Sequence, residues 1–282
     1  MTSEAQFVDA GLAETLLGDG AGIDRAPDIG AEQRRRTVIA FVGMAFEAKI
    51  AAGPGVLVLS RNSRRELATA AENAARHGYR GIVSFGVAGG LAAGLQPGDW
   101  VVASSIVDAQ SARATDAAWS QNLLNAIDGA HYAPIAGVDT PVAEPARKRE
   151  LHRTTGAAAV DMESHVVAEL AAAHGLAFTA LRVIVDPADR TIPSAALLGM
   201  GAGPRADGVA VLRELVAQPS QLPRLVRIAL DAFVARSEMV RVRRLIGEHF
   251  GHPEAMRTNL LSADLRSADF AAVEAATYRS PA

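Results

Sequence analysis

The sequence TVIAFVG, at residues 37–43, is a continuous apolar run that ends at Gly43. Apolar side chains on both faces are typical of a buried strand in a parallel sheet. Similar runs follow at residues 55–60, 81–87, 100–107, 156–160 and 176–186. Helix-forming segments lie between them, from Arg64 to His77 and from Met162 to His174. This alternation predicts an α/β protein, a three-layer α/β/α sandwich around a mixed central sheet.

Both ends of the chain depart from this pattern. Residues 1–36 mix Gly, Asp, Ala and Pro without periodicity, which predicts a flexible leader. Residues 37–247 form the predicted folded domain, and residues 248–282 lose the apolar period, which predicts a C-terminal tail. The apolar runs are shorter than the roughly 20 residues of a spanning helix, and the N-terminus lacks the pattern of a secretory signal. We therefore expect a cytoplasmic protein.

Composition excludes several kinds of chemistry. The 282 residues include no cysteine, so disulfides, thiol nucleophiles and cysteine-bound metals are excluded. The net charge of −3 shows no basic bias, and we expect no nucleic-acid partner. No HExxH pair and no GxSxG sequence occurs, so we expect neither a metal site of that kind nor a serine nucleophile on a sharp turn.

The segment from Pro204 to Gly247 is basic, with eight arginines against four acidic residues. Within it a helical spacing gathers an apolar stripe, which consists of Leu222, Leu225, Val226, Ala229 and Phe233. Two interpretations fit this stripe. It is either a final helix packed on the sheet, or a basic amphipathic helix that lies on an anionic membrane surface.

Two motifs offer groups that bind a ligand. In SFGVAGGL, residues 84–91, glycines after a strand let the backbone approach a ligand closely. In AVDMESH, residues 159–165, Asp161, Met162 and Glu163 lie where a strand meets a helix. A carboxylate there can accept two hydrogen bonds from the vicinal hydroxyls of a sugar. The alternative is structural: Asp161 caps the helix and Glu163 is a first-turn acid.

Two further motifs offer acids at strand ends. Asp186 ends the apolar run of LRVIVDPAD, where groups of the active site often lie in open α/β sheets, and it is a candidate general acid. The alternative is a turn-forming Asp-Pro pair. Glu47, in GMAFEAK, follows the first strand and is a candidate base for water; otherwise it is an ordinary exposed acid.

In this order, the four motifs and PGDWVVAS at residues 97–104 resemble the 5′-methylthioadenosine/S-adenosylhomocysteine nucleosidase and purine nucleoside phosphorylase superfamily. The resemblance spans residues 37–247, and it is closest to the hopanoid-associated phosphorylases, thought to remove adenine from adenosylhopane. It implies a nucleoside phosphorylase-like catalytic domain, a homo-oligomer, and no cofactor, with inorganic phosphate as the co-substrate of a phosphorolysis.

The resemblance also implies roles for single residues. Asp186 would protonate the purine N7, and Arg182 would support the loop that carries it. Glu47 would activate water, although an ungapped alignment from Gly43 leaves it one position short.

The remaining residues carried over by the resemblance bind the substrate. Met162 and Glu163 would hold the ribose, with Glu163 on the hydroxyls. The backbone of Ala88 and Gly89 would line the base and sugar.

The sequence departs from the family at two positions. Val185 stands where nucleosidases carry a serine, and Ser84 stands where hexameric phosphorylases carry a phosphate-binding arginine. Arg61, Arg64 and Arg65 are candidate replacements. Water and phosphate therefore both remain open as the nucleophile.

The expected function is cleavage of the ribose–adenine N-glycosidic bond of a purine nucleoside, adenosylhopane, in hopanoid biosynthesis. A substrate linked to lipid would bring the basic helix to the membrane, at its inner face. One alternative is a soluble methylthioadenosine/S-adenosylhomocysteine nucleosidase, and another is a non-catalytic nucleoside-binding protein.

Overall fold

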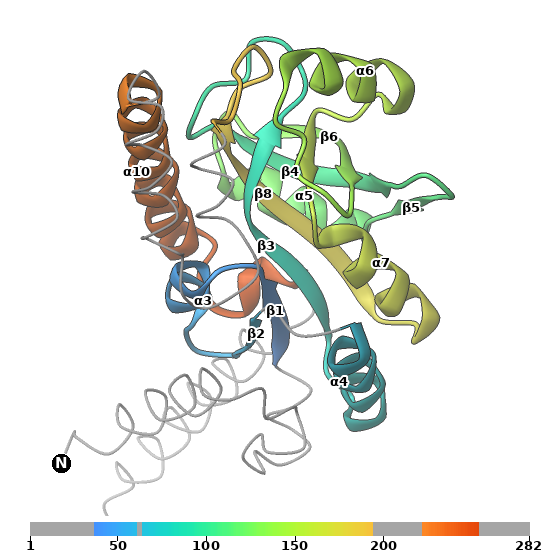
Figure 1. The fold of residues 1–282 in the computed structure, drawn as a ribbon. Coiled ribbons are helices and arrows are strands. Elements are labelled where there is room, and N and C mark those ends of the chain that lie inside the picture. The colour runs from blue at the N-terminus through green and yellow to red at the C-terminus, as the bar shows by residue number, and fades with distance from the viewer. Residues whose placement is uncertain (1–36, 61–63, 194–221, 254–282) are drawn as a thin grey trace, which may run out of the picture.

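A computed structural model describes residues 37–60, 64–193 and 222–253 (Figure 1). The expected leader at 1–36 and most of the expected tail, from residue 254 onward, lie outside the described residues. So does the first part of the basic segment, up to residue 221.

The described residues form one sheet with helices on both faces. The strands are β1 (Val38–Val42), β2 (Val56–Ser60), β3 (Gly81–Gly90), β4 (Trp100–Val107), β5 (Ala112–Ala114), β6 (His131–Gly137), β7 (Ala159–Asp161) and β8 (Ala177–Asp186). The helices are α3 (Ala45–Ala51), α4 (Arg64–His77), α5 (Ala117–Ala126), α6 (Pro145–Thr155), α7 (Ser164–Ala173), α10 (Leu222–Leu245) and the 3-10 helix η3 (Glu248–Gly251).

The eight-stranded sheet is mixed. Its order is β2-β1-β3-β7-β6-β4-β5, and β8 pairs with both β3 and β4. β1, β3 and β8 are parallel neighbours, whereas β7 runs antiparallel to β3 and β4 runs antiparallel to β8. Since β3, β8, β4, β6 and β7 pair in a continuous circuit, this part of the sheet closes on itself.

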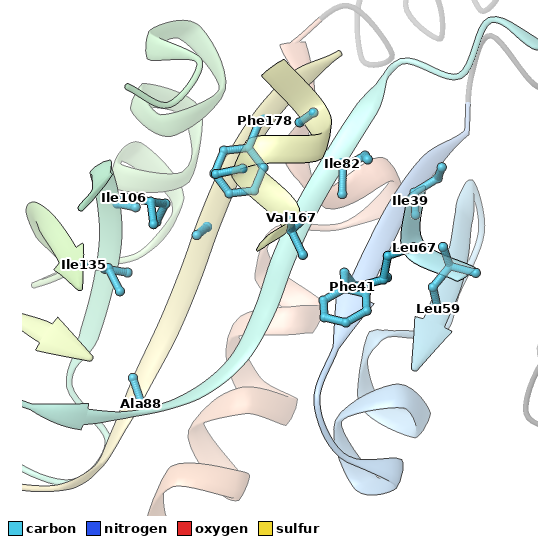
Figure 2. Packing of buried hydrophobic residues seen from close by; sticks show 14 of the residues in the cluster. Ile39, Phe41, Leu59, Leu67, Ile82, Ala88, Ile106, Ile135, Val167 and Phe178 are labelled. Carbon is cyan, nitrogen blue, oxygen red and sulfur yellow. The ribbon is translucent and has the colours of Figure 1, made fainter. Parts of the chain in front are cut away.

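Successive side chains of β1 enter two different cores. Ile39 and Phe41 belong to a cluster with residues of α4 and α7, which Figure 2 shows. Val38, Ala40 and Val42 belong to a cluster with residues of α3, α5 and α10. Figure 1 shows α3 and α10 on one side of the sheet and α4 and α7 on the other. The three-layer sandwich around a mixed sheet is therefore confirmed, and both buried faces explain why β1 is apolar throughout.

Four elements between β4 and β7 were not predicted. They are β5, α5, β6 and α6. In PARKRELHRTT, the sequence of α6, the one buried side chain is that of Lys148, so no apolar stripe marks the helix. Its limits are nevertheless encoded locally, since Pro145 stands in its first turn and Gly156 ends it in the left-handed conformation.

The domain extends past Gly247, contrary to the expected boundary. The Phe250 side chain is fully buried, and its ring lies 5.1 Å from that of Phe85 in an edge-to-face contact. Trp119 Nε1 donates a hydrogen bond to Phe250 O at 2.7 Å. The ring of His252, also buried, lies 4.6 Å from that of Trp119. A few buried rings are enough to anchor a short segment that lacks apolar periodicity, which explains why the sequence pattern did not predict it.

Of the two interpretations of α10, packing on the sheet holds for the second half of the helix only. Its second half contacts the core through Ala235, Met239 and Val242. In its first half, residues of the predicted apolar stripe are exposed instead of packed on the sheet: Val226 is 52% exposed and Phe233 is 70% exposed. Among the described residues, none of the helices is both long enough and apolar enough to span a membrane.

Candidate active site

The strand order brings the four motifs to one edge of the sheet. Because β1, β3 and β8 are parallel neighbours, their carboxyl ends meet there. Gly89 of β3 is in register with Asp186 of β8 on one side and with Val160 of β7 on the other. A cavity at this edge is lined by Gly43, Met44, Glu47, Val87, Ala88, Gly89, Val138, Pro141, Val142, Val160, Asp161, Met162, Glu163, Val185, Asp186 and Ile192.

Six of the seven residues predicted for the site line this cavity, namely Glu47, Ala88, Gly89, Met162, Glu163 and Asp186. The seventh, Arg182, is buried behind it. These placements bring the residues together, while their roles in a reaction remain predictions.

Glu47 is a buried carboxyl group held by the backbone, not an ordinary exposed acid. Its Oε2 accepts hydrogen bonds from the N–H groups of Gly43 at 2.9 Å and Met44 at 2.8 Å, and its Oε1 accepts one from Val87 at 2.9 Å. Burial raises the pKa of Glu47 to about 7, although Arg182 and the backbone donors act in the opposite direction. The group therefore changes ionisation near neutral pH, as a base for water requires.

Arg182 gathers the polar groups behind the cavity. Its Nη2 donates hydrogen bonds to Ser84 Oγ at 2.7 Å and to Ser164 Oγ at 3.0 Å. Its Nε lies 2.6 Å from Asp161 Oδ2, but the N–H is poorly aligned, so the contact is an ion pair and not a well-formed hydrogen bond. Burial disfavours the charged guanidinium, yet the carboxylates of Asp161, Glu163 and Glu47 outweigh it and raise the pKa of Arg182.

The expected role of Arg182 in supporting the loop after β8 is not met. The contacts of its guanidinium lie with Asp161 at the end of β7, with Glu163 and Ser164 at the start of α7, and with Ser84 of β3. Within the described residues, Lys148 has the position expected for Arg182, and no motif in the sequence points to Lys148. A lysine in a highly charged helix gives no local signal that it will be buried.

The two acids of the AVDMESH motif have different surroundings. Asp161 Oδ1 accepts hydrogen bonds from the N–H groups of Glu163 at 3.0 Å and Ser164 at 2.8 Å, so Asp161 holds the start of α7, although the N-cap position is that of Glu163 and not of Asp161. Glu163 faces the cavity, and its Oε2 lies 3.8 Å from Arg182 Nη2. A Cβ atom on Gly43 would lie 2.8 Å from Glu163 Oε1, which brings this carboxylate close to the backbone that holds Glu47.

Asp186 is the last residue of β8, which pairs with β3 on the side opposite to β7. A Cβ atom on Gly89 would lie 3.2 and 3.3 Å from the two carboxylate oxygens, so glycine leaves room for the acid. Burial raises the pKa of Asp186 to about 6, while the charges of Lys148 and Arg190 lower it. The carboxyl group pairs with the fully buried Lys148 ammonium.

β3 separates the two titrating carboxyl groups. Glu47 is bound by the N–H of Val87, and Asp186 lies against Gly89, two residues further on. Two residues of a strand span roughly 7 Å. A planar base and a sugar can therefore lie along Val87, Ala88 and Gly89 with one acid at each side.

The two positions that depart from the family have different surroundings. Val185 lines the cavity beside the acid. Ser84 is buried, and its hydroxyl group is engaged by Arg182 and Ser164. Arg61 and the side chains of Arg64 and Arg65 lie outside what the structure describes.

The profile of the phosphorylase superfamily matches residues 46–198, more than half of the chain. Among solved structures, the 5′-methylthioadenosine/S-adenosylhomocysteine nucleosidase of Neisseria meningitidis, in complex with methylthio-immucillin-A, is 18% identical with a TM-score of 0.51, over 74% of this chain and 97% of that one. The corresponding nucleosidase of Helicobacter pylori is 17% identical with a TM-score of 0.50, over 73% and 97%.

The futalosine hydrolase of H. pylori is 20% identical with a TM-score of 0.48, over 54% of this chain and 86% of that one. A comparison with curated protein sequences gives no match. At these identities the structural likeness concerns the fold, whereas the sequence profile decides the family. The chain therefore belongs to the phosphorylase superfamily, and the predicted enzyme of the nucleoside phosphorylase and nucleosidase type is confirmed.

Proposed function

We propose that this protein cleaves the N-glycosidic bond between ribose and adenine in a purine nucleoside, with water as the nucleophile. The observation that carries the proposal is the convergence of Glu47, Glu163 and Asp186 on one cavity. Two of these carboxyl groups have pKa values of about 7 and about 6, so both can exchange protons near neutral pH.

The chemistry follows from where charge develops. As the C1′–N9 bond breaks, its electron pair goes to the purine and positive charge develops on the sugar. Asp186, in its protonated form, gives its proton to the purine N7. Glu47, in its ionised form, takes a proton from the water that attacks C1′, and the Glu163 carboxylate holds the ribose hydroxyls. The products are adenine and a free sugar.

The charges around Glu47 favour water over phosphate. A phosphate dianion would bind beside the carboxylates of Glu47 and Glu163. Among the described residues, the guanidinium that acts on Glu47 is that of Arg182, which is buried and already pairs with Asp161. Ser84, in place of a phosphate-binding arginine, brings no further positive charge. Water meets no such repulsion.

For the substrate we propose adenosylhopane, in hopanoid biosynthesis. The resemblance of the motifs supports it, and so does the apolar wall of the cavity, which is built from Val138, Pro141, Val142 and Ile192. Such a wall suits a nucleoside with an apolar 5′ substituent. The same wall also suits methylthioadenosine, so the two nucleosides must be compared directly.

A lipid-linked substrate brings the enzyme to a membrane surface, and α10 suits that contact. Its first half exposes Val226, Leu230, Phe233 and Val234 next to the exposed Arg227. Apolar side chains beside arginines are typical of helices that lie on anionic lipid. We expect the wild type to sediment with anionic liposomes at low salt and Phe233→Asp to stay in the supernatant. Equal sedimentation of both would contradict the contact.

We also propose a homo-oligomer, as the family resemblance implies. Light scattering coupled to size-exclusion chromatography measures its mass. If Phe233→Asp lowers that mass and leaves liposome binding unchanged, the exposed face of α10 joins two copies instead of contacting lipid.

Adenine release is the direct test of the function. Purified enzyme is given adenosylhopane in detergent, or methylthioadenosine, with and without phosphate. We expect release without phosphate, and a loss of about 10²-fold or more in Asp186→Asn and Glu47→Gln. Glu150→Gln, an exposed change on α6, is the control.

The other possible outcomes of this assay each favour a different function. A requirement for phosphate would make the enzyme a phosphorylase. Faster release from methylthioadenosine would indicate a nucleosidase of small thioadenosines. Nucleoside binding without any release would refute the enzyme proposal and favour a binding protein.

A further inference from the structure

Lys148 is a fully buried cation beside the proposed acid. The chain has two lysines among its 28 basic residues, Lys49 and Lys148, and Lys49 is exposed on α3. Lys148 lies on α6 with 0% of its surface exposed. A buried ammonium group is costly unless oxygen atoms surround it, so its partners explain why it is there.

The Lys148 ammonium binds the acid and the loop that follows it. Its Nζ donates to a carboxylate oxygen of Asp186, and it lies 2.8 Å from Pro187 O, 3.3 Å from Arg190 O and 3.4 Å from Asp186 O. One side chain from α6 thus holds the last residue of β8 and the turn at residues 187–190.

Other charges face Asp186 less directly. Arg190 pairs with Asp231 of α10 and is partly exposed, and Arg227 of α10 lines the adjacent hollow that Asp186 also borders. Glu47 and Glu163 line the same cavity as Asp186. Among these groups, Lys148 is the buried cation in direct contact with the carboxyl group.

We propose that Lys148 is a positioning residue for the acid: it aims the Asp186 carboxyl group at the substrate and supplies the counter-charge for the carboxylate that remains when the proton leaves. This inference rests on the proposed function, in which Asp186 protonates the purine. Proton transfer turns a neutral acid into an anion inside a buried site, and the adjacent ammonium stabilises that anion.

The proposal has a consequence for ionisation. Burial raises the pKa of Asp186 and Lys148 lowers it. Removing the ammonium therefore raises the pKa further, by about 1–3 pH units for an opposite charge in contact. A lysine that only stabilises the fold, without a charge in contact with Asp186, would change stability without moving this pKa.

The first test needs no substrate. In protein labelled with carbon-13 at the ε position of lysine, two lysine signals are expected, and Lys49→Arg assigns them. We expect the Lys148 signal to titrate near pH 6, as Asp186 ionises, and to lose this titration in Asp186→Asn. The Lys49 signal is the internal control. A Lys148 signal that changes neither with pH nor in Asp186→Asn would overturn the proposed contact between Lys148 and Asp186.

The second test uses the reaction. Lys148→Met keeps most of the side-chain volume without the charge, and Lys49→Met is the matched control. We expect kcat to fall about 10²-fold in Lys148→Met with KM within a few-fold of wild type. In Lys148→Met, the alkaline limb of the kcat/KM profile should move to higher pH. In Lys148→Arg, this limb should return to its position in the wild type.

The two tests separate this proposal from the proposed function. If Lys148→Met does not fold, the lysine spectra of wild type and Asp186→Asn still decide whether Lys148 pairs with Asp186. An unchanged alkaline limb in folded Lys148→Met refutes the role of Lys148 even when adenine is released. A titrating Lys148 signal in a protein that releases no adenine supports the pairing and refutes the reaction instead.

Discussion

Replacing Glu47 with glutamine gives the sharpest physical test of the site. The carboxyl group is fully buried, and its pKa is raised from 4.5 to about 7. At about 1.4 kcal/mol for each pKa unit, this corresponds to about 3 kcal/mol of folding free energy. The folded state holds this proton more tightly than the unfolded chain. The stabilisation is therefore fully present below about pH 4.5 and is lost as pH rises through about 7.

Glu47→Gln cannot ionise, so its free energy of unfolding lacks this dependence on pH. The single amide oxygen can accept either from Gly43 and Met44 or from Val87, but not from all three, and that cost is the same at every pH. We expect the wild type to lose about 3 kcal/mol relative to the variant between about pH 4.5 and about pH 8. The contribution of Asp186 is common to both proteins and cancels.

Urea denaturation across this pH range measures the difference. Glu72→Gln, an exposed change on α4, is the control and should follow the wild type. Parallel curves for wild type and Glu47→Gln would refute the reasoning, because they would mean that Glu47 binds its proton equally in both states.

Three further predictions test the site and the domain boundary. If cleavage needs protonated Asp186 and ionised Glu47, the plot of kcat/KM against pH should be bell-shaped, with its maximum between pH 6 and pH 7. A value of kcat/KM that still rises at pH 9 would contradict these roles. Gly89→Ala places a methyl group 3.2 Å from Asp186 Oδ1, so we expect kcat to fall at least about tenfold. The circular dichroism spectrum should stay unchanged. A variant with the kcat of the wild type would show that Asp186 does not act as the acid at this place. Phe250→Ala leaves a cavity in a fully buried site and should lower the free energy of unfolding, measured by urea denaturation, by about 3–5 kcal/mol. A loss under about 1 kcal/mol would mean that the residues after 247 belong to the C-terminal tail and not to the folded domain.

Local patterns were sufficient for most of the fold. The run TVIAFVG is apolar at every position because β1 has a core on each side, so its burial could be read without its neighbours. The glycines and acids at the strand ends were also visible, since parallel strands bring their carboxyl ends together whatever their order. The family resemblance rests on the order of those motifs, and the sequence profile that decides the family needs no coordinates.

Elements without an apolar period could not be predicted in this way. α6 buries a lysine, and the segment after Gly247 is anchored by Phe250 together with two buried histidines, His249 and His252. The apolar stripe of α10 left two interpretations open, because exposure depends on what packs against each half of the helix.

The sequence by itself determined the class of fold, the family and the set of acids that meet at the strand ends, because these follow from periodicity and from motifs along the chain. The tertiary structure decided which charge pairs with which acid. It directs Arg182 toward Asp161 on β7 and brings Lys148 from α6 to Asp186. Such pairs join residues 21 and 38 positions apart in the chain, and no local pattern records them. Ion pairing depends on distance and burial, which exist only once the sheet and its helices have packed.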